Sequence, residues 1–195
     1  RRPPRSTLFP YATLFRSSVL VESAYYFGGP VADAEVEWTV LTQDWFFDWT
    51  GEGYYDFTDY DYLRQRTYFG PYGEVLTEGT GRTDADGRFM ISLPADIAER
   101  TVSQTFTIEA TITDVNAQEV SGRASVVVHS GEFYLGLRPL SYVTAVDQEA
   151  TVEVISVDAD SQPVPERTVE LTFYEHRWYN VRQKVDGYFQ WKTTE

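Results

Sequence analysis

The most restrictive feature of the sequence is a period-two alternation of apolar and polar side chains that recurs along the chain. It is clearest where Val36, Trp38 and Val40 alternate with polar residues. Four other segments repeat it, residues 19–24, 89–93, 105–112 and 120–128. Such alternation is typical of a strand with one buried face and one wet face. No window of eleven residues carries a helical stripe, so the sequence predicts an all-β fold of antiparallel sandwiches.

An internal repeat divides the chain into two modules. Residues 29–40 align with residues 162–173 at an offset of 133, and proline, valine, valine, glutamate and threonine recur in place. A second pair, residues 86–89 and 186–189, each beginning Asp-Gly, aligns at an offset of 100. The offset therefore shortens by 33 residues, which predicts an insertion of that length in the first module, at about residues 44–76.

The repeat also predicts the domain boundaries. We expect a first immunoglobulin-like sandwich at residues 18–130, a boundary near Ser130-Gly131 and a second sandwich at residues 131–195. Some forty residues follow the first Asp-Gly pair, whereas eight residues follow Gly187. We therefore expect the second sandwich to be truncated at its C-terminal end and the chain to be a fragment.

Four segments resemble the bacterial members of the alpha-2-macroglobulin family. They are Tyr26-Phe27-Gly28-Gly29-Pro30-Val31-Ala32-Asp33-Ala34, Val120-Ser121-Gly122-Arg123-Ala124-Ser125-Val126-Val127-Val128, Phe133-Tyr134-Leu135-Gly136-Leu137 and Gln162-Pro163-Val164-Pro165 with Val169-Glu170-Leu171. The first two are similar to the opening and the last strand of the third macroglobulin domain, and the others to the start of the fourth. The resemblance implies a non-catalytic scaffold role in an inhibitor that traps endopeptidases.

That resemblance also implies the partners and the location. The partners would be other macroglobulin domains of the same parent chain and, through the parent, target proteases. The location would be periplasmic, cell-envelope or extracellular. Many family members carry a Cys-Gly-Glu-Gln thioester, but this sequence contains no cysteine. We therefore expect the thioester and the bait segment to lie outside these modules.

Charge and cysteine content exclude several classes of function. The 195 residues include 16 basic and 30 acidic side chains, for a net charge of −14. An acidic chain of this kind has no basic patch for phosphates, so we predict no nucleic-acid binding. The absence of cysteine excludes disulfides, thiolate nucleophiles and iron–sulfur clusters. We predict no cofactor, and no membrane contact from this segment.

Residues 1–17 differ in character from the rest of the chain. They contain four arginines and no acid. The run Thr7-Leu8-Phe9-Pro10-Tyr11-Ala12-Thr13-Leu14-Phe15-Arg16-Ser17 resembles the translation of a widely used sequencing adapter, apart from Ala12. We interpret this segment as an artefact of sequencing or cloning and set it apart from the fold. The alternative is a genuine disordered N-terminal arm.

The insertion is the most distinctive local feature. Residues 44–61 contain six acids, no basic residue and eight aromatics: Trp45, Phe46, Phe47, Trp49, Tyr54, Tyr55, Phe57 and Tyr60. One hypothesis is that the aromatics contact a protein or carbohydrate partner. The other, which we favour, is that they pack back onto the sheet while the acids face water, since many exposed aromatics would promote aggregation.

Metal binding and catalysis find little support in the sequence. Asp56, Asp59 and Asp61 cluster, and Asp84-Ala85-Asp86-Gly87 resembles part of a calcium loop. A hairpin turn explains the second run better, because Asp-Gly supplies the positive φ that such a turn needs. We predict no metal site. His129 and His176 have no evident acid or nucleophile partner, so we predict a protein that is not an enzyme.

Two other functions remain open from the sequence. The chain could be a tandem immunoglobulin-like segment of a bacterial surface adhesin, or an accessory sandwich module of a secreted carbohydrate-active enzyme. The gene downstream of Glu195 discriminates among the three. A thioester motif or helical toroid supports the inhibitor, more sandwich repeats support the adhesin, and a catalytic domain supports the accessory module.

Overall fold

β-strands and one short α-helix are the regular elements of the described part of the chain. The computed structural model describes residues 5–13, 16–65, 70, 73–94, 97, 100–173, 175, 177, 179–185 and 188–194. Its elements are β1 (Arg5–Thr13), β2 (Arg16–Ala24), β3 (Glu35–Asp44), α1 (Tyr60–Gln65), β4 (Glu74–Arg82), β5 (Arg88–Pro94), β6 (Gln104–Thr113), β7 (Glu119–Val128), β8 (Tyr134–Pro139), β9 (Val152–Val157), β10 (Tyr179–Val185) and β11 (Tyr188–Thr194). Within these ranges, no helix is long and apolar enough to cross a membrane.

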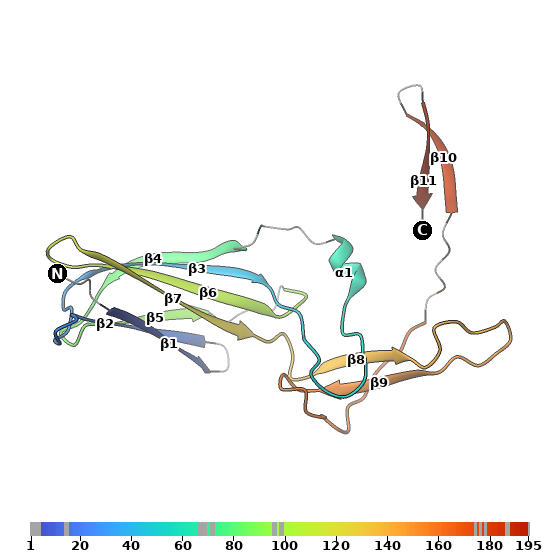
Figure 1. Cartoon of the computed structure of the whole chain (residues 1–195), viewed down its shortest axis with the longest axis horizontal. Helices are drawn as coiled ribbons and strands as arrows, with labels where there is room; N and C mark the ends of the chain where they lie inside the picture. Colours follow the sequence, from blue (N-terminus) through green and yellow to red (C-terminus); the bar gives the residue numbers. More distant parts are fainter. Residues whose placement is uncertain are drawn as a thin grey trace. The chain divides into compact units, whose positions relative to one another are not determined.

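Two antiparallel sheets form the first sandwich, which confirms the predicted fold class. One sheet has the strand order β1-β2-β5 and the other β4-β3-β6-β7 (Figure 1). Their facing side chains share one hydrophobic core. Its buried members are Val19, Val21, Val31, Ala34, Val36, Val40, Ile91, Leu93, Phe106, Ile108, Ala110 and Ile112. The period-two pattern predicted all of these residues except Val31 and Ala34, which lie between β2 and β3, because every second side chain of a strand points to the same face.

The internal repeat has a direct structural counterpart. The Val31 amide donates to the Ser23 carbonyl over 3.0 Å, and the Val164 amide donates to the Ser156 carbonyl over 2.9 Å. Both pairs are related by the offset of 133 that aligns the two modules in the sequence. The prolines beside them match as well, since Pro30 and Pro163 each form an isolated bridge to the end of the preceding strand. β9 is therefore the counterpart of β2.

Three turns share one five-residue structure. The Oδ1 atom of Asp84 accepts the amides of Asp86 and Arg88, each over 2.9 Å. Asp114 and Asp158 accept the amides two and four residues ahead in the same way. The Asp84 turn joins β4 to β5, which belong to different sheets. It is thus a corner between the two sheets, and the predicted hairpin between paired strands is wrong.

Part of the segment set apart in the sequence takes part in this fold. β1, at Arg5–Thr13, pairs antiparallel with β2 along its whole length. This differs from our expectation, and the reason is that an open strand edge can pair with any extended backbone rich in strand-forming residues. β1 pairs antiparallel with β2, as β8 pairs antiparallel with β9, the counterpart of β2. The foreign origin of residues 1–17 stays a prediction.

The second module follows the repeat only in part. β11 begins 100 residues after β5, as the repeat predicts, but it pairs with β10, whereas β5 pairs with β2. Residues 169–173 align with β3 yet form no strand. β3 is held by β4 and β6 on its two sides, and residues 169–173 have no such paired neighbours among the described residues. The predicted Asp186-Gly187 turn lies outside the described residues.

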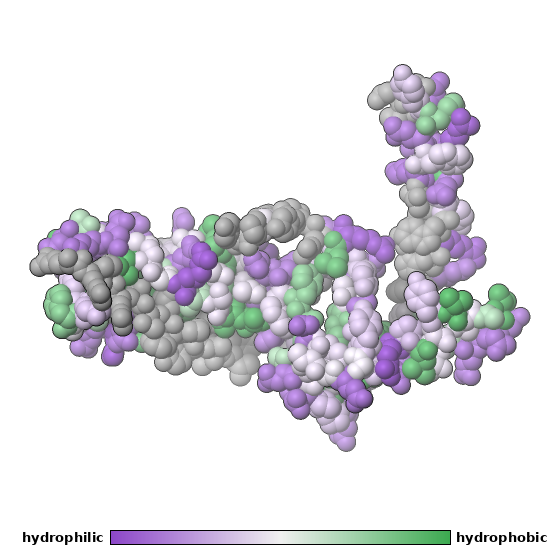
Figure 2. All heavy atoms as spheres, in the orientation of Figure 1, coloured by the Kyte–Doolittle hydropathy of each residue, from purple (hydrophilic) through white to green (hydrophobic). Residues whose placement is uncertain are grey.

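Packing divides the chain at a different place from the repeat. The compact units are residues 1–164 and 165–195. The β8–β9 hairpin thus packs with the first unit, although the repeat assigns it to the second module. The loop between β8 and β9 exposes apolar side chains (Figure 2). Tyr142 is 99% exposed and Val146 is 90% exposed.

Candidate functional site

The aromatic segment of the predicted insertion lies between β3 and β4. We call residues 45–57 the strap. Of the eight predicted contact residues, Trp45, Phe47, Trp49, Tyr55 and Phe57 are half-buried, while Phe46, Tyr54 and Tyr60 are exposed. None of the eight belongs to the hydrophobic core of the first sandwich or to the side chains packed against it. Our expectation that these rings pack back onto their own sheet does not describe the contacts that they make.

The half-buried rings stack on one another and on the first strand of the second module. Phe47 stacks on Tyr134 with ring centroids 4.6 Å apart and planes 18° apart. The ring centroid of Phe57 lies 4.6 Å from that of Phe47, and the ring centroid of Trp49 lies 5.9 Å from that of Phe57. Tilted and offset contacts at these distances are favourable for aromatic rings. The strap therefore forms a small aromatic cluster against β8.

The backbone of the strap also pairs with β8. The Asp56 amide donates to the Leu137 carbonyl, and the Leu137 amide donates to the Asp56 carbonyl, each over 2.9 Å. β8 otherwise pairs only with β9 within the described part of the chain. An unpaired strand edge is a template for unwanted pairing. Asp56 covers that edge of β8.

A charged triad ties the strap to both strands of the hairpin. The Tyr55 hydroxyl donates to Glu153 Oε2 over 3.1 Å, and Arg138 donates to the same oxygen through Nε over 2.9 Å. The Arg138 guanidinium lies 4.8 Å from the centre of the Tyr55 ring. The bonds from Arg138 and then Tyr55 hold the pKa of Glu153 below its usual value. Burial, reinforced by the Glu153 bond, raises the pKa of Tyr55.

His129, one of the two histidines, lies at the base of this cluster. Its Nδ1 atom is 2.6 Å from the Tyr134 hydroxyl, which is 2.8 Å from Ser103 Oγ. The His129 ring also meets Trp45 edge-on, with centroids 5.3 Å apart. His176 lies outside the described residues.

Two acidic residues of the insertion, Asp56 and Asp59, accept local hydrogen bonds. Asp56 accepts the Thr58 amide and the Tyr60 hydroxyl, over 2.9 and 2.8 Å. Asp59 accepts the Tyr62 amide over 2.9 Å at the start of α1. Among the residues that the structure describes, no three His, Asp or Glu side chains gather closely enough to hold a metal ion. The carboxylates shape the loop.

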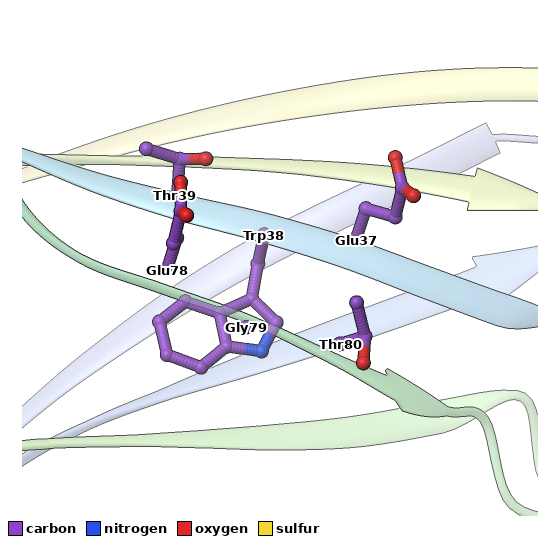
Figure 3. Close-up of a pocket in the computed structure, with 6 residues that line it drawn as sticks. All are labelled: Glu37, Trp38, Thr39, Glu78, Gly79 and Thr80. Atoms are coloured by element: carbon purple, nitrogen blue, oxygen red, sulfur yellow. The ribbon is translucent and has the colours of Figure 1, made fainter.

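A shallow hollow of about 310 Å³ lies over the edge strand β4 (Figure 3). Its lining residues are Glu37, Trp38, Thr39, Glu78, Gly79 and Thr80. The buried Nε1 of Trp38 has no hydrogen-bond partner among the described residues. Glu37 and Glu78 are exposed to solvent. The hollow is therefore an open surface groove at the edge of the sandwich.

Sequence reasoning found the strap but missed the surface that it contacts. Tyr134, Arg138 and Glu153 complete the cluster, yet they lie some 80 to 100 residues further along the chain. Gly136 gave the one local signal, a glycine inside a strand pattern, which often marks a close approach. A Cβ at Gly136 would lie 2.5 Å from the Phe57 ring.

The chain is similar in structure to bacterial alpha-2-macroglobulins. The superposition on native Escherichia coli alpha-2-macroglobulin covers 82% of this chain, with a TM-score of 0.57 and 14% sequence identity. The superposition on E. coli alpha-2-macroglobulin activated by porcine elastase covers 83% of this chain, with a TM-score of 0.56 and 16% sequence identity. The superposition on Salmonella alpha-2-macroglobulin reacted with methylamine covers 100% of this chain, with a TM-score of 0.56 and 14% sequence identity.

These similarities show a shared fold. The chain spans only 11% to 15% of the length of these three proteins. No family model and no curated protein sequence matches the chain.

Proposed function

We propose that the chain is a non-catalytic scaffold segment of a bacterial alpha-2-macroglobulin-like inhibitor that traps endopeptidases. In this proposal residues 18–130 correspond to the third macroglobulin domain and residues 131–195 to the beginning of the fourth. The observation that carries it is the likeness of fold to alpha-2-macroglobulins of E. coli and Salmonella.

Two features of the chain support a scaffold role. The modules repeat the same bond at Ser23–Val31 and Ser156–Val164, as expected of tandem domains in one long protein. The strap residues contact the next module, which is the kind of surface that joins neighbouring domains. The proposed partners are other macroglobulin domains of the parent chain and, through the parent, target proteases. The proposed location is the periplasm, the cell envelope or the exterior.

The test requires the full gene. Native DNA is resequenced on both sides of this region, and the complete protein is incubated with trypsin or elastase. A trap excludes large substrates from the enclosed protease, so we expect cleavage of a large protein substrate to fall at least about tenfold while cleavage of a small peptide substrate continues.

Three results would overturn the proposal. These are unchanged cleavage of the large substrate, a downstream region of sandwich repeats only, and a downstream catalytic domain. The 195-residue chain alone serves as the control, and we expect it to inhibit neither reaction.

A further inference from the structure

The two modules are joined by a short covalent connection. β7 ends at Val128 and β8 begins at Tyr134, so residues 129–133 link them. A link of this kind by itself leaves neighbouring domains free to reorient unless a packed interface fixes them. The position of the β8–β9 hairpin therefore depends on contacts away from the link.

The strap supplies contacts of three different kinds. Phe47 stacks on Tyr134, and the Phe57 ring lies over Gly136. Asp56 gives two backbone hydrogen bonds, and Tyr55 joins the ion pair of Arg138 and Glu153. Thr50 adds a fourth point of attachment, because its amide donates to the buried Ser161 Oγ over 3.3 Å. These contacts reach β8, β9 and the turn that follows β9.

Both surfaces are shaped for this contact. Gly136 is buried, and the Phe57 ring occupies the space where a Cβ would lie. On the strap, Gly53 has a φ of +79°, and a Cβ there would lie 3.0 Å from the Arg138 guanidinium. A side chain at Gly136 would push Phe57 away, because a separation of 2.5 Å is far below van der Waals contact.

The sequence repeat places the strap in the first module only. The shortening of the offset from 133 to 100 shows that the second module has no counterpart of the 33-residue insertion. The strap is thus an added element on a shared framework.

We propose that the strap is a docking surface for the β8–β9 hairpin. The contact between strap and hairpin locks the hairpin and the first sandwich into one rigid body. This inference does not depend on the proposed function, since it rests on contacts within the chain.

The absence of cysteine from the sequence makes a clean distance measurement possible. Spin labels are placed on cysteines introduced at Ser121 in β7 and at Val146, both exposed. In the otherwise unchanged 195-residue chain we expect one narrow distance distribution. The G136V and F57A variants, which disrupt the contact from opposite sides, should each widen the distribution at least about twofold.

Matched controls separate docking from general damage. G131A adds a methyl group at a glycine whose Cβ would have its nearest contact at 3.5 Å, and Y54A removes a ring that is 75% exposed. Both should keep the narrow distribution. Hydrogen exchange at the Ile108 amide reports whether the first sandwich remains folded. If Ile108 stays protected and both disrupting variants keep the narrow distribution, the proposal is wrong.

Discussion

At the scale of single residues, one aspartate organises each of three turns. Asp114 is 5% exposed and accepts the Asn116 and Gln118 amides through Oδ1, over 2.7 and 3.0 Å. The Gln118 amide makes the largest contribution to lowering the pKa of Asp114. A carboxylate that accepts backbone amides is favoured in its charged form. The turn is therefore more stable when Asp114 is ionised.

The D114N variant tests this charge. Asparagine keeps an oxygen acceptor but carries no charge, so we expect a lower free energy of unfolding than wild type at pH 7. The advantage of wild type should be complete above the unfolded pKa, which is near 3.8, and should disappear as the pH falls through the lower folded pKa. Urea unfolding at about pH 7 and about pH 3 measures the difference in the free energy of unfolding between wild type and D114N.

The D160N variant is the control for this experiment. Asp160 is exposed, and the amide bonds of its own turn go to Asp158. Its substitution should have little effect at either pH. A wild-type advantage over D114N that grows toward low pH would contradict the interpretation.

The fourth residue of each turn adopts a left-handed backbone. Gly87, Ala117 and Ser161 have φ values of 74°, 57° and 62°. An alanine there is strained, since its Cβ approaches the backbone. We expect A117G to raise the free energy of unfolding by about 0.5 kcal/mol.

The comparison for A117G is A85G in the Asp84 turn. Ala85 is exposed and does not have a positive φ. Glycine should therefore lower the free energy of unfolding there by about 0.5–1 kcal/mol through the entropy of the unfolded chain. Thermal melting of both variants measures the change in Tm relative to wild type. If the backbone argument holds, Tm rises in A117G and falls in A85G; a change of the same sign in both variants would contradict it.

At the scale of elements, edge strand β4 depends on two glycines. Gly79 lies opposite Trp38, and a Cβ there would lie 2.6 Å from the indole. Gly81 accommodates Phe89 of the other sheet in the same manner, with a separation of 2.2 Å. The missing side chains let two large rings cover the core at the sandwich edge.

The G79A variant should therefore be destabilised by overpacking. We expect a loss of about 1–3 kcal/mol, measured by urea unfolding. T80A on the same strand is the control, because Thr80 is exposed, and its change should stay within about 0.5 kcal/mol. Equal losses in both variants would show that the Trp38 contact is not the cause.

The predictability of the elements follows from the same side chains. β3 and β6 were predicted because their alternation is continuous, and both lie inside a sheet with one buried face. β4 was missed because Gly79 and Gly81 remove the apolar residues that would have marked its inner face. The six residues of α1 are too few to show a helical stripe. The docking of the strap depends on Gly136 and Glu153, which lie far from the strap along the chain. Apart from the glycine in the β8 pattern, no local pattern marks the contact.

At the scale of the whole molecule, negative charge dominates the surface. The net charge is −14, and the ion pairs that the structure describes lie at partly or fully exposed positions, as at Arg88 with Glu22. Exposed pairs contribute little to stability. Repulsion among the unpaired carboxylates should therefore weaken the folded state at low salt.

Salt should raise the thermal stability of the chain. We expect Tm to increase by about 2–5 °C between about 20 mM and about 300 mM NaCl, because the screening length shortens. Replacing Glu37 of β3 and Glu78 of β4, which both line the hollow, by glutamine should reduce this increase. A Tm that falls with added salt would mean that the ion pairs outweigh the repulsion.

The shared turn offers a search pattern for distant relatives. Each copy has aspartate, then aspartate or asparagine two residues later, a small residue after that, and arginine or glutamine at the fifth position. Because the first aspartate alone accepts the two amides that close the turn, the pattern should survive where the strands have diverged beyond alignment. Each occurrence would mark a turn directly after a strand, as it does after β4, β6 and β9, and so would locate strand ends in an unaligned sequence.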